Sequence, residues 1–469
     1  MPYQAASFDS AAGFSRRTLL KNSALGFGAI ALADILAREG EGSETSLKPT
    51  HFAPRAKRVI FLFMHGGPSA IDTFDYKPLL ERDNGKPLPF DKPRIQFAQT
   101  GNLLRSPWKF RQYGQCGAWI SDLFPEVARC VDDLCFIKSM HGSNEAHGGA
   151  LLKIHTGSDT FVRPSKGAWI SYGLGTENTN LPAFVTINPT LGHGGVQNFG
   201  SGFLPPEHQA TRIGSSGAAM KNATIANLTP PNAKRYDQRK QLDFVQKLNH
   251  HQLNRYAHSP ELDARIESLE LAFRMQMEAP EVLDLNQETS ATHQLYGIDQ
   301  PNTENFGREC LLARRLSEAG VRFVQVSHAY WDQHSELKEK HSELAAQVDR
   351  PIAGLLKDLK QRGLLDETLV IWGAEFGRTP TAQGNNGRDH NPHAFTYWFA
   401  GGGVKPGFSY GISDDYGFYA VDQKVHVHDY HATLLHLLGL DHEKLTFHYG
   451  GRDFRLTDIH GRVIHDIMT

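Results

Sequence analysis

The sequence predicts an α/β fold with a largely parallel central sheet and helices on both of its faces. Two observations support this. Near-continuous apolar runs such as "VIFLFM" at residues 59–64 are typical of strands that are covered on both sides. Such runs alternate with amphipathic helical stretches along much of the chain of 469 residues. No later segment reaches the ~18 apolar residues of a membrane span, so we expect no transmembrane helix.

The elements follow one another in a regular order. Strands are expected within "KRVIFLFM", "DLCFIKSM", "LPAFVTINP", "VRFVQVSH", "DETLVIWGAEFG" and "AFTYWFAGGG", at 57–64, 133–140, 181–189, 321–328, 366–377 and 394–403. Helices are expected at 147–157, 306–320, 341–363 and from about 429 onward. Gly157 and Gly320 end the first two of these helices, and the third is expected to continue through Pro351.

The N-terminus resembles an export signal. Arg16 and Arg17 precede a short apolar run from about 22 to 37, which is typical of a twin-arginine signal. The alternative is an amphipathic surface helix. We therefore expect a signal at 1–37, a linker at 38–56 and a single domain at 57–469, with a helical insertion at about 203–300. The protein would be periplasmic or secreted.

Charge and cysteine content argue against two classes of function, nucleic-acid binding and zinc binding by cysteines. The formal net charge is −2, which gives no basic face for nucleic acid. The four cysteines, at 116, 130, 135 and 310, form no CxxC motif and no zinc pattern. They could form one or two disulfides, and the sequence does not assign a pairing.

Histidines and carboxylates gather where the predicted strands end. Ligands of open α/β sheets bind at the carboxyl ends of the strands. Five segments bring such residues there: His65, His141 to His147, His328 with Asp332 and His334, Glu375, and Asp389 with His390 and His393 in the expected loop "GRDHNPHAF". Imidazole and carboxylate are ligands of zinc and manganese. Any one of these histidines could be a solvated loop residue, but the set predicts a metal site.

Several of these stretches together resemble the DUF1501 family, exported proteins of planctomycete-type bacteria that are relatives of the sulfatase and alkaline phosphatase superfamily. The resemblance is carried by "VIFLFMHGGPSAIDTFDYKP", "WDQH", "DETLVIWGAEFGRTP", "GRDHNPHAFTYWFAGGGVKPG" and "VHDYHATLLHLLGLD". It implies an alkaline-phosphatase-like three-layer α/β/α sandwich with a mostly parallel sheet and a helical insertion.

The resemblance also implies site residues, with departures from the superfamily's pattern. His65 stands where the superfamily has Asp after the first strand. His147 stands in the slot of the nucleophile, with no Cys, Ser or Thr there, which excludes the formylglycine mechanism. His334, and less closely Asp332, match an Asp and His pair. Glu375 stands where the superfamily has the Asp of an Asp-His-Gly motif. His390 best matches a later histidine, and His393 is the second choice.

Both lines of reasoning predict one site. The predicted metal ligands are His65, His147, Asp332, His334, Glu375 and His390, with His393, Asp389, Asp72 and His328 as second choices. His147 could instead be a general base or a nucleophile. Arg378 could neutralise a sulfate or phosphate group, or form a structural ion pair. His341 is expected on the solvated surface, and Asp75 in a turn.

The function expected from this site is hydrolysis of sulfate or phosphate esters by an exported, metal-dependent protein. The cation would be Zn²⁺ or Mn²⁺, with Ca²⁺ as a further option. The partner would be an anionic small molecule or a sulfated polysaccharide. The alternative is a non-catalytic relative that binds an anionic glycan or a partner protein, and the missing nucleophile favours it. The sequence leaves the substrate and the oligomeric state open.

Overall fold

The computed structural model describes residues 47–469, apart from 92–100, 224, 226–234, 256–259 and 385. The predicted export signal at 1–37 and residues 38–46 of the predicted linker lie outside the described residues. Within the described part of the chain, no helix is both long and apolar enough to cross a membrane.

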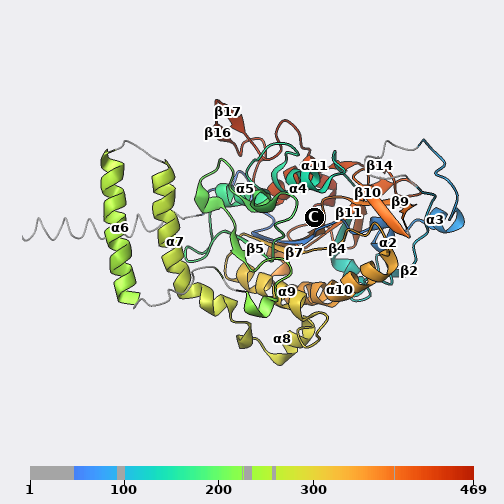
Figure 1. Ribbon diagram of the computed structural model, residues 1–469, viewed down its shortest axis with the longest axis horizontal. Helices are drawn as coiled ribbons and strands as arrows, with labels where there is room; N and C mark the ends of the chain where they lie inside the picture. The colour runs from blue at the N-terminus through green and yellow to red at the C-terminus, as the bar shows by residue number, and fades with distance from the viewer. Residues whose placement is uncertain (1–46, 92–100, 224, 226–234, 256–259, 385) are drawn as a thin grey trace, which may run out of the picture. The chain divides into compact units, whose positions relative to one another are not determined.

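A central sheet organises the domain (Figure 1). Its strands lie in the order β12-β4-β11-β8-β1-β7-β5-β6, and β15 also pairs with β4. The strand bounds are β1 (Arg58–Met64), β4 (Leu134–His141), β5 (Phe184–Ile187), β6 (Thr211–Ile213), β7 (Phe323–His328), β8 (Thr368–Gly373), β11 (Phe395–Ala400), β12 (Phe408–Tyr410) and β15 (Val425–His426).

Strand direction decides where the site can form. β1 pairs in parallel with β7 and β8, and its last residue, Met64, faces His328. β11 is antiparallel to both of its neighbours, β4 and β8, so β4 runs in the same direction as β8. The carboxyl ends of β1, β4, β5, β7 and β8 therefore share one edge with the beginning of β11. The mostly parallel sheet predicted from the sequence is confirmed.

Helices cover both faces of this sheet, which confirms the three-layer α/β/α architecture. Alternate residues of β1 belong to two different cores: Ile60 and Leu62 to one, Phe61 and Phe63 to the other. Figure 1 shows α9 (Glu304–Glu318) and α10 (Leu337–Gln361) on one side of the sheet, and α4 (His147–Thr156), α5 (Lys166–Leu174) and α11 (Val427–Leu437) on the other. Burial on both faces explains why β1 is apolar throughout.

Local signals place the helix that carries His147. α4 ends at Gly157, as predicted, and this glycine has φ 76°. Only glycine adopts this left-handed conformation readily at a helix end. α10 continues through Pro351, also as predicted.

The remaining elements lie at the edges of the sheet or outside it. The helices are α2 (Ala70–Thr73), α3 (Pro78–Arg82), α6 (Arg235–Arg255), α7 (Pro260–Leu283) and α8 (Ser290–Leu295), with 3-10 helices at Val127–Asp133, Gly195–Phe199, Pro206–His208, Met220–Asn222, Leu285–Gln287, Leu365–Glu367 and His465–Ile467. The strand pairs are β2 (Phe110–Tyr113) with β3 (Ala118–Ser121), β9 (Gly377–Gln383) with β10 (Gly387–Asn391), β13 (Ile412–Ser413) with β14 (Ala420–Asp422), and β16 (Phe447–Tyr449) with β17 (Arg452–Phe454).

Three expectations differ from the structure. The predicted insertion at 203–300 contains α6, α7 and α8, but its first part contributes β6, which pairs in parallel with β5. The segment "GRDHN", expected as a loop, is strand β10 and pairs with β9. All four cysteines are free, so no disulfide forms. Strands as short or polar as β6 and β10 show no apolar alternation by which a sequence could reveal them.

Candidate metal centre

The predicted site residues meet at the carboxyl edge of the sheet. His65 follows β1, and its main-chain N–H donates to the carbonyl of His328 at 2.8 Å, which joins the ends of two neighbouring strands. His147 is the first residue of α4. Asp332 and His334 lie in the loop after β7. The segment after β8 and the β9–β10 hairpin supply the others: Glu375, Arg378, Asp389 and His390.

The Asp332 carboxylate is the centre of this cluster. Its Oδ1 lies 2.9 Å from Nε2 of His334 and 3.1 Å from Nε2 of His390. The Arg378 guanidinium donates to the same oxygen at 2.6 Å. Oδ2 lies 3.2 Å from Nε2 of His147, at ion-pair distance but without good hydrogen-bond geometry. One carboxylate thus touches three imidazoles and a guanidinium.

Glu375 holds His147 from the other side. Its Oε1 lies 2.8 Å from Nδ1 of His147 and accepts the N–H of Gly66 at 2.9 Å. Gly66 has φ 113°, and a Cβ there would lie 2.7 Å from the main-chain nitrogen of Trp331. Only glycine therefore allows this turn to pack against the loop that carries Asp332.

The electrostatics follow from these contacts. Burial lowers the pKa of His147, but its contacts with Asp332 and Glu375 outweigh burial and raise it to about 9. Burial would raise the pKa of Asp332, yet its three histidine contacts and Arg378 hold it well below its usual range. Contact with Asp332 raises the pKa of His334. Asp332 is therefore an ionised carboxylate at neutral pH.

Among the residues that the structure describes, three overlapping groups of side chains could each hold a metal ion. Within each group, one ligand atom per residue lies within 4.8 Å of the others. The groups are His65–His147–His193, His147–Asp332–His390 and His334–Asp389–His390. They include five of the six predicted ligands, and Glu375 reaches them through His147.

His193 was missed from the sequence. It lies between Gly192 and Gly194 in a loop without apolar periodicity, so no strand end pointed to it. Its ring stacks on that of His147, with ring centres 4.8 Å apart. Phe376 also escaped notice as a contact residue, and its ring stacks on that of His390 at 4.4 Å.

Buried polar atoms in this cluster lack partners. Among the described residues, His65 Nε2 and Glu375 Oε2 are buried and have no hydrogen-bond partner. An unpaired buried polar atom costs about 1–3 kcal/mol. Such atoms beside several imidazoles are what a bound cation or a ligand would satisfy.

Arg378 lies in the cluster but faces inward. It is 1% exposed, and its Nε donates to the carbonyl of Gly67 at 2.9 Å. Its NH2 group contacts the carbonyls of Gly66 and Trp331 as well as Asp332. These contacts match the structural ion pair that the sequence left open, and they hold Asp332 in place.

Of the second-choice ligands, one lies in the cluster and the others have different surroundings. Asp389 lies 3.8 Å from Nδ1 of His334, inside the cluster. Asp72 is fully buried and pairs with Arg388, with one contact at 2.6 Å, outside the cluster. His328 is half-buried and hydrogen-bonds to Trp331 and Gln347, and His393 packs on Phe418 and Tyr419.

One surface prediction was wrong. His341 is fully buried, and its Nε2 accepts the N–H of Ser69 at 3.2 Å. Its place on the inner stripe of α10, under Trp331, explains this burial. Asp75 is also buried and accepts the hydroxyl of Ser413 at 2.5 Å.

Known proteins give a limited comparison. The PsFucS1 sulfatase from Pseudoalteromonas sp. is similar to this chain at 13% identity and a TM-score of 0.35, over 82% of this chain and 68% of that one. The lipoteichoic acid synthase LtaP from Listeria monocytogenes has 10% identity and a TM-score of 0.36, over 85% of this chain and 76% of that one. A protein in the alkaline phosphatase superfamily from Vibrio parahaemolyticus has 12% identity and a TM-score of 0.37, over 84% of this chain and 69% of that one.

These distant likenesses add nothing to what the sheet and its layers establish. No curated protein matches the chain. The family model described as "Protein of unknown function (DUF1501)" matches residues 56–468, nearly the whole length. The chain therefore belongs to the DUF1501 family.

Proposed function

We propose that the protein is an exported, metal-dependent hydrolase of sulfate or phosphate esters, including esters carried by polysaccharides. The observation that carries this proposal is the set of three overlapping His and Asp groups at the carboxyl edge of the sheet. Carboxylate and imidazole are the donors that Zn²⁺ and Mn²⁺ prefer.

The residues present fit a divalent cation. His334 and His390 both direct Nε2 toward Asp332, and His390 donates through Nδ1 to the carbonyl of Glu145 at 2.6 Å. Such outer contacts fix the orientation of a ligating imidazole. His334, Asp389 and His390 would hold the ion, with Asp332 beside it, and the ion would polarise an ester oxygen and lower the pKa of a neighbouring water.

His147 is best placed as a ligand that Glu375 orients. Because the Glu375 carboxylate can only accept, Nδ1 of His147 carries the hydrogen, and Nε2 is left facing Asp332. An Nε2 in this position could bind an ion, or take a proton as a general base once His147 has lost its second hydrogen. Glu375 would then act through His147 rather than as a direct ligand.

Arg378 takes a positioning role in this proposal. Its hydrogen bonds go to main-chain carbonyls and to Asp332, so its guanidinium is occupied by the protein. It would keep the Asp332 carboxylate ionised and correctly oriented. Charge on a substrate sulfate or phosphate would be balanced by the cation.

The alternative, binding of an anionic glycan without turnover, is favoured by one observation. α4 begins with His147, and neither this slot nor the next two residues offers a hydroxyl or thiol nucleophile. The cluster would then serve recognition only.

Activity distinguishes the two. A panel of aryl sulfates, aryl phosphates and sulfated glycans is assayed with Zn²⁺, Mn²⁺ and Ca²⁺ added in turn. The enzyme should turn over at least one member, His334→Ala should abolish turnover, and His393→Ala, a histidine outside the cluster, should leave it unchanged. If no member is turned over faster than with His334→Ala, binding replaces hydrolysis as the proposed function.

A further inference from the structure

A cavity of about 410 Å³ is lined in part by the loop that carries Asp332. It is within the size range of small-molecule sites, about 300–1,000 Å³. Its lining includes Ser327 and His328 at the end of β7, and Tyr330 and Gln333 from the loop that also carries Asp332. The cavity and the cluster thus share one loop.

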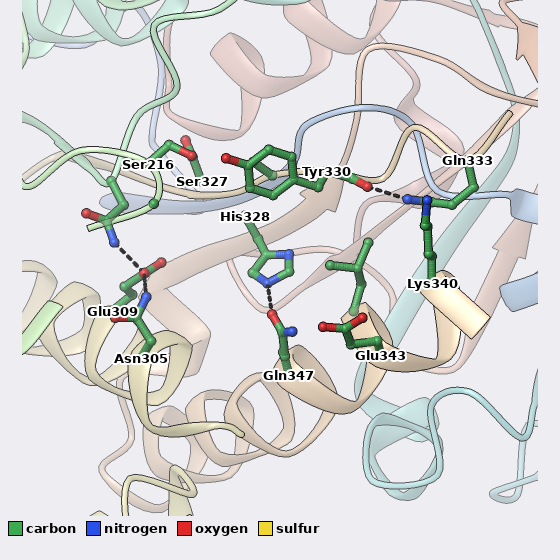
Figure 2. A pocket seen from close by; sticks show the side chains of 14 residues that line it. Ser216, Asn305, Glu309, Ser327, His328, Tyr330, Gln333, Lys340, Glu343 and Gln347 are labelled. Carbon is green, nitrogen blue, oxygen red and sulfur yellow. Dashed lines mark hydrogen bonds between the residues drawn. The ribbon is translucent and has the colours of Figure 1, made fainter. Parts of the chain in front are cut away.

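The lining of the cavity is polar but not cationic. Figure 2 shows Glu309 and Asn305 on one side and Lys340 and Glu343 on the other. Lys340 pairs with Glu336 at 2.9 Å. Burial lowers the pKa of His328 to about 4, so this imidazole is neutral at pH 7. No excess of positive charge is available here for a sulfate or phosphate group.

Glu309 is the unusual member of this lining. It is 2% exposed, and its Oε1 accepts from Asn188 at 2.6 Å and from Asn305 at 2.8 Å. Its Oε2 is buried and has no partner among the residues that the structure describes. Burial raises the pKa of Glu309 to about 8, so the carboxyl is mostly protonated at neutral pH. A protonated carboxyl both donates and accepts hydrogen bonds, as a sugar hydroxyl does.

Tyr330 places an aromatic ring at this cavity. It is 69% exposed and has φ 77°, a left-handed conformation that costs a non-glycine residue about 1–3 kcal/mol. Gln333 donates to its carbonyl, which fixes the turn. The Tyr330 hydroxyl lies across from Gly217, 3.9 Å from where a Cβ would be. A strained backbone thus holds an amphipathic ring over the cavity.

We propose that this cavity binds the uncharged, hydroxyl-bearing part of the substrate, a sugar ring, with Tyr330 as its stacking surface and Glu309 as its hydrogen-bonding partner. This inference rests on the proposed function, because it assigns the anionic ester to the neighbouring cluster. It names a glycan as the substrate class and two residues that select it.

Binding to a glycan array with neutral and sulfated members tests this inference. The protein should bind at least one neutral glycan, and Tyr330→Asn should weaken that binding at least tenfold, since Asn tolerates the left-handed conformation. Glu309→Leu, which removes both the donor and the acceptor, should also weaken it, whereas Glu309→Gln keeps both and should bind like the unchanged protein. Tyr449→Ala, which removes an exposed ring on β16, is the matched control and should bind like the unchanged protein.

The variant His334→Ala distinguishes the proposal of a glycan-binding cavity from the proposal of a hydrolase. His334→Ala should lose metal and turnover but keep the neutral glycan, because His334 does not line the cavity. If hydrolysis fails on every ester while Tyr330-dependent binding persists, the cavity proposal stands without the enzyme. If no neutral glycan binds, or if binding is lost in His334→Ala and unaffected in Tyr330→Asn, the cavity proposal is overturned.

Discussion

Asp332 shows how single residues define this site. Its carboxylate gathers His334 from its own loop, and His147, Arg378 and His390 from α4, β9 and β10. A carboxylate so surrounded stays ionised, and the imidazoles around it are held within a few ångströms of one another. Asp332 therefore supplies the negative charge that a cation site needs, and it also brings the imidazoles together.

A second residue, Lys166, makes a testable contribution to stability. It is 1% exposed, its Nζ donates to the carbonyl of Ile154 at 3.3 Å, and it lies 3.6 Å from the centre of the Phe61 ring. Burial lowers the pKa of Lys166 well below its ordinary value. Between the folded and unfolded pKa values the unfolded chain binds more protons, so stability should rise as pH rises.

Lys166→Met should remove this pH-dependent cost. We expect the free energy of unfolding to increase by about 1–3 kcal/mol at neutral pH, with a smaller gain at alkaline pH. Urea denaturation at both pH values measures this. Lys444→Met, on the exposed surface, should change little. A Met variant that is less stable than the unchanged protein at neutral pH would contradict this account of Lys166.

Elements with a complete pattern could be predicted from the sequence. β1 is apolar on both faces because both faces are buried, and α4 ends where Gly157 permits it. β6 and the β9–β10 hairpin could not be predicted, because three to seven polar or mixed residues carry no periodic signal. The burial of Arg378 depends on the carbonyls of a distant turn, which no local pattern reveals.

The end of α4 gives an element-scale prediction. At Gly157 an added Cβ would lie 2.1 Å from the carbonyl of Leu456, whereas at Gly85, with φ 82°, no atom lies within 4 Å. Both substitutions to Ala impose left-handed strain of about 1–2 kcal/mol. Gly157→Ala should cost a further ~1–3 kcal/mol because of the clash. Urea denaturation of the two variants compares them, and equal losses would show that the clash is relieved.

For the whole molecule, the same edge of the sheet carries the cluster and the polar cavity. Residues 328–334 join them: Tyr330 and Gln333 line the cavity, while Asp332 and His334 belong to the cluster. The positions of the strand ends could be predicted from the sequence, so most of the cluster could be as well. The cavity could not, since its lining comes from loops and from the inner surfaces of α9 and α10.

Export is a whole-molecule prediction that rests on the sequence. Changing both Arg16 and Arg17 to Lys should leave the protein in the cytoplasm, because twin-arginine export depends on the pair rather than on its charge. Lys21→Arg, which keeps the charge within the same segment, should be exported normally. Cell fractionation follows both variants. Normal export of the double variant would contradict the prediction of a twin-arginine signal.

The metal content of the purified protein tests the central claim most directly. After loading with Zn²⁺ or Mn²⁺ and removal of the excess, elemental analysis should find tightly bound metal in a stoichiometric amount. His334→Ala and His390→Ala should lose it, and His393→Ala should retain it. A folded protein that binds neither ion, or that binds it equally well without His334 and His390, would contradict the claim that this cluster is a metal centre.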